Sequence, residues 1–264
     1  MKPVQTALST VSMAAALFLA SACNSAQSAA SHPTIVLVHG AFADASSWNG
    51  AISILSHDGY PVVAAANPLR GVRSDADEID SVIDSIHGPV VLVGHSYGGS
   101  VISEAAFGRQ NVKALVFVSA FEPDAGETGA GLSSARPGAT LGATLAPPVL
   151  LQGGGHDLYI QQDRFPAQFA ADVPAAQAAL MAATQRPILD AALSEPSTAP
   201  AWKTIPSWTI YGSADLNIPP AEMAFMAQRA HARRTVVING GSHVIMVSHP
   251  NEVAALIEEA ANAR

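Results

Sequence analysis

The stretch Gly94-His95-Ser96-Tyr97-Gly98-Gly99 decides the fold of this chain, because of the segments on either side of it. Residues 89–93 (PVVLV) are apolar and mostly β-branched, which predicts a short buried strand, and residues 100–106 (SVISEAA) have the composition of a helix. A Gly-x-Ser-x-Gly motif between a strand and a helix is typical of the nucleophile elbow, a turn so tight that small residues must flank the serine. We therefore expect the Ser96 hydroxyl to stand above the sheet edge, where it can attack a carbonyl carbon.

Strand and helix patterns alternate along most of the chain. Apolar strands separated by helices indicate a parallel sheet that is covered on both faces, so we expect an α/β fold with about six mostly parallel strands. Besides the strand before Ser96, strands are expected at 34–38, 61–66, 112–119, 206–211 and 235–239, with helices at 46–59, 74–87, 219–231 and 251–261.

This alternation breaks between Phe121 and Trp202. The stretch is rich in Ala, Gly and Pro and carries Gly153-Gly154-Gly155 near its middle. Its recurring Leu, Ile, Phe and Tyr residues argue against a disordered insert. We expect a helical cap at about 121–202, inserted into a single domain of residues 34–264.

The first 22 residues have the pattern of a secretory signal peptide. Residues 11–20 (VSMAAALFLA) form a short apolar segment, and Ala20-Ser21-Ala22 offers a small-x-small cleavage site before Cys23. Cys23 is the only cysteine, so a disulfide framework cannot form, and its position after the cleavage site is where bacterial lipoproteins are acylated. We expect export, with the protein periplasmic, secreted or lipid-anchored at Cys23, and with residues 23–33 as a tether. A buried N-terminal helix is the alternative.

Charge and motif content restrict the partners. A net charge of −8 at pH 7 without a basic run argues against binding of nucleic acid or of an anionic membrane through the protein surface. The chain has no Gly-x-x-x-x-Gly-Lys loop and no His-Glu-x-x-His pair, and its histidines are scattered. We therefore expect a small-molecule substrate, no cofactor and no metal, while the oligomeric state stays open.

A nucleophilic serine needs an imidazole to accept its proton and a carboxylate to orient that imidazole. His243 lies in Gly240-Gly241-Ser242-His243, after the last predicted strand, at the edge where active sites of open α/β sheets form. We expect His243 to be the base, and His156 of the insert is the alternative.

The acid should lie between the serine and the histidine in the chain. Asp215 follows the predicted strand at 206–211 and precedes His243, as this order requires. Asp124 and then Glu122 are the rivals, because they follow the strand that ends at Ser119. We favour Asp215, although Gly-Ser-Ala-Asp is also ordinary turn chemistry.

Two backbone N–H groups must face the charge that develops on the substrate oxygen. One is expected from Tyr97, the residue after the nucleophile. The other is expected from the loop His39-Gly40-Ala41-Phe42 after the first strand, with Ala41 as the first candidate and Phe42 as the second. The histidine of this loop is expected to make a structural hydrogen bond, and His95 to be a packed neighbour.

Together these residues resemble the α/β-hydrolase superfamily over nearly all of residues 34–261. Within it, the chain is similar to the small-cap branch that contains plant methyl-ester esterases, hydroxynitrile lyases and bacterial relatives. The resemblance implies a triad of Ser96, Asp215 and His243. The matching stretches are His39-Gly40-Ala41-Phe42 through Trp48, Gly94 to Gly99, Phe121-Glu122-Pro123-Asp124, Asp215 and Gly240-Gly241-Ser242-His243. Substrate contacts are expected from Phe42, Gly40, Tyr97 and Val244.

Two positions depart from the lyases of this branch. Lyases resembling the rubber-tree type have a threonine where Gly40 stands and a lysine where Val244 stands, and without that ammonium nothing obvious stabilises a leaving cyanide. The favoured function is a serine hydrolase that cleaves a small-molecule carboxylic ester through an acyl-enzyme. The alternatives are an amide, lactone or polyester bond cleaved by the same triad, a hydroxynitrile lyase, and a non-catalytic small-molecule binding protein.

Overall fold

The computed structural model describes residues 1, 3 and 32–263. Almost all of the predicted signal peptide and tether, Cys23 included, therefore lies outside the described residues. Residues 32–264 form one unit of the chain, and its described part is the subject below. None of the helices in this part is long and apolar enough to span a bilayer.

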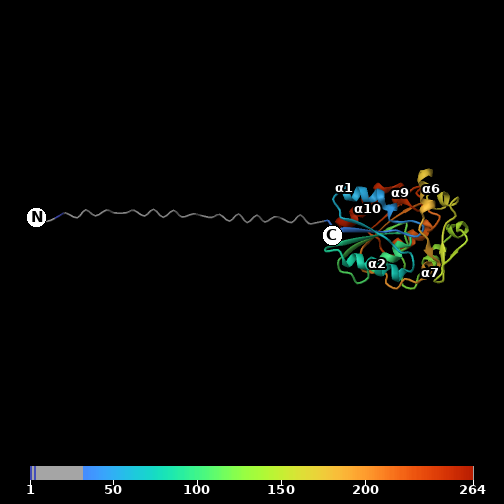
Figure 1. Ribbon diagram of the computed structural model, residues 1–264, viewed down its shortest axis with the longest axis horizontal. Helices are drawn as coiled ribbons and strands as arrows, with labels where there is room; N and C mark the ends of the chain where they lie inside the picture. The colour runs from blue at the N-terminus through green and yellow to red at the C-terminus, as the bar shows by residue number, and fades with distance from the viewer. Residues whose placement is uncertain (2, 4–31, 264) are drawn as a thin grey trace. The chain divides into compact units, whose positions relative to one another are not determined.

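Six parallel strands form the central sheet, in the order β2-β1-β3-β4-β8-β9 (Figure 1). The prediction of about six mostly parallel strands flanked by helices is confirmed. The strand that leads into Ser96 lies inside the sheet between β1 and β4, so its carboxyl end is surrounded by the ends of other strands. The strands are β1 (Thr34–Val38), β2 (Val62–Ala65), β3 (Val90–His95), β4 (Val112–Val118), β8 (Ser207–Gly212) and β9 (Arg234–Ile238).

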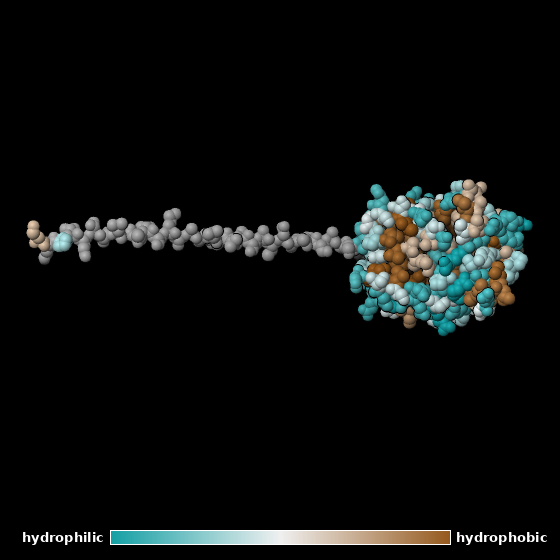
Figure 2. Space-filling view, viewed as in Figure 1, coloured by the Kyte–Doolittle hydropathy of each residue, from teal (hydrophilic) through white to brown (hydrophobic). Residues whose placement is uncertain are grey.

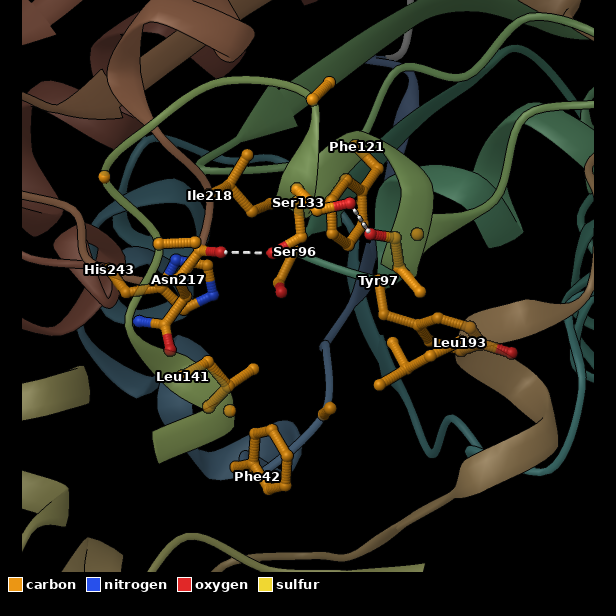
Figure 3. A pocket seen from close by; sticks show the side chains of 18 of the residues that line it. Phe42, Ser96, Tyr97, Phe121, Ser133, Leu141, Leu193, Asn217, Ile218 and His243 are labelled. Carbon is orange, nitrogen blue, oxygen red and sulfur yellow. Dashed lines mark hydrogen bonds between the residues drawn. The ribbon is translucent and has the colours of Figure 1, made fainter. Parts of the chain in front are cut away.

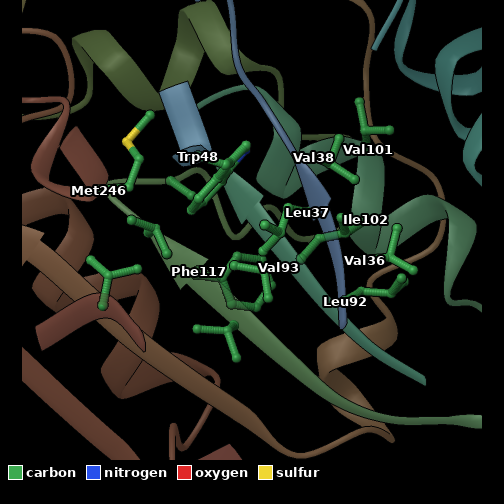
Figure 4. Packing of buried hydrophobic residues seen from close by; sticks show 14 of the residues in the cluster. Val36, Leu37, Val38, Trp48, Leu92, Val93, Val101, Ile102, Phe117 and Met246 are labelled. Atoms are coloured by element: carbon green, nitrogen blue, oxygen red, sulfur yellow. The ribbon is translucent and has the colours of Figure 1, made fainter. Parts of the chain in front are cut away.

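Successive side chains of each inner strand point to opposite faces of the sheet, and both faces are buried. Figure 4 shows Leu37 and Val93 on the side of Trp48, and Val36 and Leu92 on the other side. All of these side chains are fully buried. Burial of each aliphatic side chain contributes about 1.5–3 kcal/mol, which explains why these strands are continuous apolar runs.

Helices cover both faces of the sheet (Figure 1). On one face lie α1 (Asn49–His57), α9 (Ile245–Ser248) and α10 (Pro250–Asn262). On the other lie α2 (Val72–Asp84) and α3 (Gly98–Ala105), the helix that continues from the elbow. The helix α8 (Pro220–Arg229) joins β8 to β9, and the 3-10 helix η1 (Ala45–Trp48) precedes α1.

The chain between β4 and β8 leaves the sheet and forms a mainly helical insert. Its helices are α4 (Gly129–Ser134), α5 (Phe165–Phe169), α6 (Ala175–Thr184) and α7 (Asp190–Ser194), with the 3-10 helices η2 (Leu141–Thr144) and η3 (Ala201–Lys203). The insert also holds an antiparallel sheet of β5 (Val149–Leu150), β6 (His156–Leu158) and β7 (Ile188–Leu189), which we did not predict. Strands of two or three residues are too short to show an alternating pattern.

The surface of this unit is mixed in character. Figure 2 shows polar and apolar areas side by side on one face of residues 32–263. Phe107, Leu150 and Leu180 are the most exposed large apolar side chains of this unit, and they come from three different elements or loops. Single exposed apolar residues are common in globular proteins, so they carry no functional argument.

Candidate active site

Ser96 is in the strained backbone conformation that an elbow requires. Its φ is 53°, in the left-handed region that few residues other than glycine adopt. The chain is packed so closely here that a Cβ at Gly98 would lie 2.5 Å from the Val38 carbonyl oxygen, and one at Gly99 would lie 2.1 Å from the Phe121 carbonyl oxygen. Glycine is therefore required at both positions, and Gly98 is the second glycine of the Gly-x-Ser-x-Gly motif.

The elbow is anchored to a neighbouring helix through Tyr97. The Tyr97 hydroxyl donates to Asp75 Oδ2 of α2 at 2.9 Å, and both side chains are buried. Burial raises the pKa of the Asp75 carboxyl, and it also raises the pKa of the Tyr97 hydroxyl. Because Asp75 also accepts from the backbone N–H of Arg70 at 3.0 Å, the residue after Ser96 is tied to the start of α2.

His243 and Asp215 form a buried hydrogen-bonded pair. His243 Nδ1 lies 2.7 Å from Asp215 Oδ2, and the two side chains are 1% and 0% exposed. The other oxygen, Oδ1, accepts from the backbone N–H groups of Asn217 at 2.7 Å and Ile218 at 3.0 Å. Since a carboxylate accepts, the proton of the pair is assigned to Nδ1, which leaves Nε2 able to accept a proton.

Ser96 and His243 line the same cavity, which has a volume of about 600 Å³. Figure 3 shows Ser96 and His243 together with apolar side chains from the insert and from the sheet edge. The main apolar side chains of its wall are Phe42, Phe121, Leu141, Leu145, Phe169, Leu193 and Ile218.

Two backbone N–H groups at this cavity have no acceptor among the described residues. Ala41 and Tyr97 both line the cavity, and within the described part of the chain neither N–H has a hydrogen-bond acceptor. The prediction of Phe42 as the second candidate for an unoccupied N–H group is wrong, because its N–H donates to the Arg186 carbonyl oxygen at 2.9 Å. The ring of Phe42 still lines the cavity.

Residues 35–256 match the family model described as the alpha/beta hydrolase family. The chain belongs to this family. The match runs from β1 into α10 and therefore includes the sheet, the elbow, the insert and His243.

Known relatives of this α/β hydrolase agree with the assignment. The alpha/beta hydrolase nvfD of Aspergillus novofumigatus (strain IBT 16806) is 25% identical over 248 residues, which cover 87% of this chain and 96% of that protein. The crystal structure of polyneuridine aldehyde esterase superposes with a TM-score of 0.74 at 19% identity, covering 88% of this chain and 100% of that one. An extracellular α/β-hydrolase from a Paenibacillus species, described as sharing structural and functional homology with tobacco salicylic acid binding protein 2, gives 0.70 at 24% identity, with coverage of 88% and 100%. At these identities the solved structures show a common fold.

The rival acids of this α/β hydrolase lie away from His243. Asp124 is paired with Lys203, whose Nζ lies 2.5 Å from Asp124 Oδ1, and this hydrogen bond lowers the pKa of Asp124. Glu122 is buried beside Met226, and burial raises its pKa to about 8. Neither carboxyl group contacts the imidazole, whereas Asp215 does.

The other histidines considered have different partners. His156, the alternative base, pairs with Asp190 at 3.0 Å, is about half exposed and does not line the cavity. His39 accepts from the Asn67 N–H at Nε2 (3.1 Å), and its Nδ1 lies 2.9 Å from the carbonyl oxygen of the next residue, so it makes the structural hydrogen bonds we expected. His95 lies under the site, with Nε2 3.2 Å from the His243 carbonyl oxygen, and burial lowers the pKa of His95 well below its usual range.

Of the four residues predicted to contact substrate, two lie at the cavity. Phe42 and Tyr97 line the cavity, but Gly40 and Val244 do not. Val244 is fully buried in the hydrophobic core. Gly40 lies directly behind Ser96, where a Cβ would be 2.6 Å from Ser96 Cβ, so the absence of a side chain at Gly40 provides space for the elbow.

Several neighbours of the site were not predicted. Phe169 of α5 lines the cavity, with its ring centroid 5.0 Å from that of His243. The Ser133 hydroxyl of α4 donates to the Asn217 carbonyl oxygen at 2.9 Å (Figure 3). Asn217 follows Asp215 in a turn pattern that the sequence does carry, but the residues from the insert have no local signal, because their role depends on how the insert folds back.

Proposed function

We propose that this α/β hydrolase is a serine esterase that cleaves neutral, mainly apolar small-molecule carboxylic esters through an acyl-enzyme intermediate. The observation that carries the proposal is the buried pair of His243 and Asp215, 2.7 Å apart, at the cavity that Ser96 also lines. The free N–H groups of Ala41 and Tyr97 at that cavity support it further.

The proposed reaction has two halves. Ser96 Oγ attacks the ester carbonyl carbon while His243 Nε2 accepts the serine proton, and Asp215 stabilises the imidazolium. The oxygen of the tetrahedral intermediate accepts hydrogen bonds from Ala41 and Tyr97. The C–O bond then breaks, and the alcohol leaves with the proton from His243. Water attacks the acyl-enzyme in the same way, with His243 again as base, and releases the carboxylic acid.

The cavity supports an apolar substrate without charge. Its volume of about 600 Å³ lies within the range of small-molecule sites, and no carboxylate side chain is among the described residues that line it. The single guanidinium on its wall, that of Arg136, is already held by α8: Nε lies 3.2 Å from the Ala221 carbonyl oxygen and 3.2 Å from Glu222 Oε2. That polyneuridine aldehyde esterase is by name an esterase agrees with this reaction class.

Steady-state hydrolysis of p-nitrophenyl acetate, butyrate and hemisuccinate by the wild type and by Ser96→Ala tests the proposal. We expect the two neutral esters to be preferred over the charged hemisuccinate. Ser96→Ala should lower kcat by about 10³-fold or more, since the nucleophile is lost. Ser81→Ala, which changes an exposed serine of α2, serves as the matched control and should leave kcat unchanged. Full activity in Ser96→Ala would contradict the proposal.

A further inference from the structure

Residues 168–172 of the insert contact both the loop that carries the proposed acid and the loop that carries the proposed base. The segment comprises the end of α5 and the turn after it. Gln168 and Asp172, at its two ends, do not line the cavity, so they have no direct route to a substrate there.

Gln168 holds the loop after β8. It is buried, and its Nε2 donates to the Leu216 carbonyl oxygen at 2.9 Å and to Asn217 Oδ1 at 3.2 Å. The Gln168 backbone carbonyl accepts from Asn217 Nδ2 at 3.1 Å, and its Oε1 accepts from the Thr140 hydroxyl at 2.8 Å. Asn217 in turn donates its backbone N–H to Asp215 Oδ1. Gln168 therefore acts on Asp215 through one intervening residue.

Asp172 holds the loop that carries His243. Its Oδ1 accepts from the Ser242 hydroxyl, and its Oδ2 accepts from the Ser248 hydroxyl at 2.8 Å. Ser242 directly precedes His243, and Ser248 ends the helix α9 that follows it. One carboxylate thus joins the two sides of the proposed base.

Phe169, which lies between Gln168 and Asp172 in the chain, packs against the imidazole of His243. Its ring is 1% exposed and lies against both the His243 ring, at 5.0 Å between centroids, and the His95 ring, at 6.3 Å. A ring in this position restricts rotation of the His243 side chain about its own bonds.

We propose that Gln168 and Asp172 are positioning residues that hold Asp215 and His243 in the geometry required for proton transfer, acting through Asn217 and Ser242. This inference rests on the proposed serine esterase function. It adds that the insert completes the catalytic geometry as well as enclosing the substrate. A displacement of about 1 Å at a catalytic group can lower the rate about 10²-fold, so loss of either anchor affects turnover.

The test is the kinetics of Gln168→Leu and Asp172→Ala on p-nitrophenyl acetate and butyrate. We expect kcat to fall about 10- to 100-fold by the same factor for both esters, with KM nearly unchanged. Asp172→Asn can still accept from Ser242 and donate to Ser248, so it should recover most of the lost kcat. An unchanged kcat in Gln168→Leu and Asp172→Ala, or losses that differ between the esters and appear in KM, would overturn the proposal.

Gln185→Leu is the matched control for a general loosening of the insert. Gln185 is also a buried glutamine of the insert, but among the residues that the structure describes its side chain bonds only to the backbone of Ile160 and Ala182. We expect this variant to keep its kcat. A loss equal to that of Gln168→Leu would assign the effect to the insert as a whole and overturn the proposal. Should Gln168→Leu not fold, Gln168→Met, which is neutral, flexible and also lacks the Nε2 donor, takes its place.

The proton on His243 Nδ1 gives an independent readout. In the wild type its hydrogen bond to Asp215 should give a downfield proton NMR resonance, assigned by its loss in His243→Ala. We expect this resonance to shift or broaden in Gln168→Leu and Asp172→Ala and to stay in place in Gln185→Leu. A wild type without esterase activity overturns the proposed function itself, whereas an active wild type with unaffected variants overturns the positioning role alone.

Discussion

Asp215 differs in its contacts from the other acidic side chains that follow strands of the central sheet. Its Oδ2 faces His243 Nδ1 and its Oδ1 is held by two backbone N–H groups. Asp124 instead forms an ion pair with Lys203. A carboxylate held on both oxygens can orient the imidazole and stabilise its positive charge, which an exposed ion pair elsewhere cannot do.

We expect Asp215→Asn to lower kcat about 10³- to 10⁴-fold, because asparagine favours the wrong imidazole tautomer and carries no charge. Asp124→Asn is the matched control, and kcat should stay close to that of the wild type. Steady-state kinetics on p-nitrophenyl butyrate measures both variants. The assignment of the acid would be wrong were Asp124→Asn the more damaged of the two.

Gly40 offers a second test at the residue scale. A Cβ there would lie 2.6 Å from Ser96 Cβ and 2.7 Å from the His95 carbonyl oxygen, and neither atom is the end of a flexible side chain. We expect Gly40→Ala to lower kcat about 10²-fold by displacing the nucleophile, and to lower Tm as well.

Gly153→Ala is the control for this substitution, because a Cβ at Gly153 meets no atom within 4 Å. Its kcat and Tm should match those of the wild type. A Gly40→Ala variant with wild-type kcat would show that Ser96 tolerates the displacement and that the close approach has no catalytic meaning.

At the scale of elements, β4 leads into a buried acid that the proposed reaction does not use. Glu122 is 1% exposed, and burial raises its pKa from the ordinary value of 4.5 to about 8. Between these pH values the folded state keeps this proton while the unfolded chain loses it. Protein stability therefore falls as the pH rises. The contribution of Glu122 to the free energy of unfolding is most favourable below about pH 4.5, where the side chain is neutral in both states. It reaches its least favourable value above about pH 8, where the folded state must hold the charged carboxylate.

We expect Glu122→Gln, which keeps the side chain neutral at every pH, to remove this contribution. Between about pH 5 and pH 8, the free energy of unfolding of this variant should fall less than that of the wild type. The difference between the two decreases should be a few kcal/mol, because one unit of pKa corresponds to about 1.4 kcal/mol. Urea denaturation at several pH values measures the difference. Glu78→Gln, at an exposed position of α2, should follow the wild type, and identical pH profiles for Glu122→Gln and the wild type would refute the assignment.

The sequence predicts elements well where a single segment carries the pattern. The strand expected at 89–93 is β3 (Val90–His95), and the one expected at 206–211 is β8 (Ser207–Gly212). The strands of the insert are different, because β6 (His156–Leu158) pairs with β5 across a short turn and with β7 (Ile188–Leu189), a segment remote in the chain. Strands this short carry no alternating pattern, and a pairing with a remote segment leaves no trace in local composition.

The same distinction applies to the site. Ser96, Asp215 and His243 each follow a strand of the parallel sheet, so their convergence at one edge could be predicted from the order of elements. Whether the N–H of Phe42 is available could not be predicted in this way, because that N–H donates to the carbonyl oxygen of Arg186 in the insert. The contacts of the positioning residues Gln168 and Asp172 also depend on how the insert folds, so they could not be predicted either.

At the scale of the whole molecule, the described elements and their core lie within residues 32–263, and the family match covers 35–256. We expect a chain that begins at His32 to fold with the Tm of the full-length protein and to have the same kcat/KM within about twofold. Thermal denaturation and esterase kinetics on both forms measure this. A shortened chain that aggregates or has lost its activity would show that the preceding residues contribute to the fold.

The central claim is that Ser96 is a nucleophile activated by His243 and Asp215. Covalent labelling with a fluorophosphonate, followed by mass spectrometry of the digested protein, tests it most directly, because this reagent reacts with activated serines and does not depend on the natural substrate. We predict a single adduct on the peptide that contains Ser96, absent in Ser96→Ala and formed much more slowly in Asp215→Asn. A wild-type protein that stays unlabelled, or one labelled at another residue, would contradict the claim.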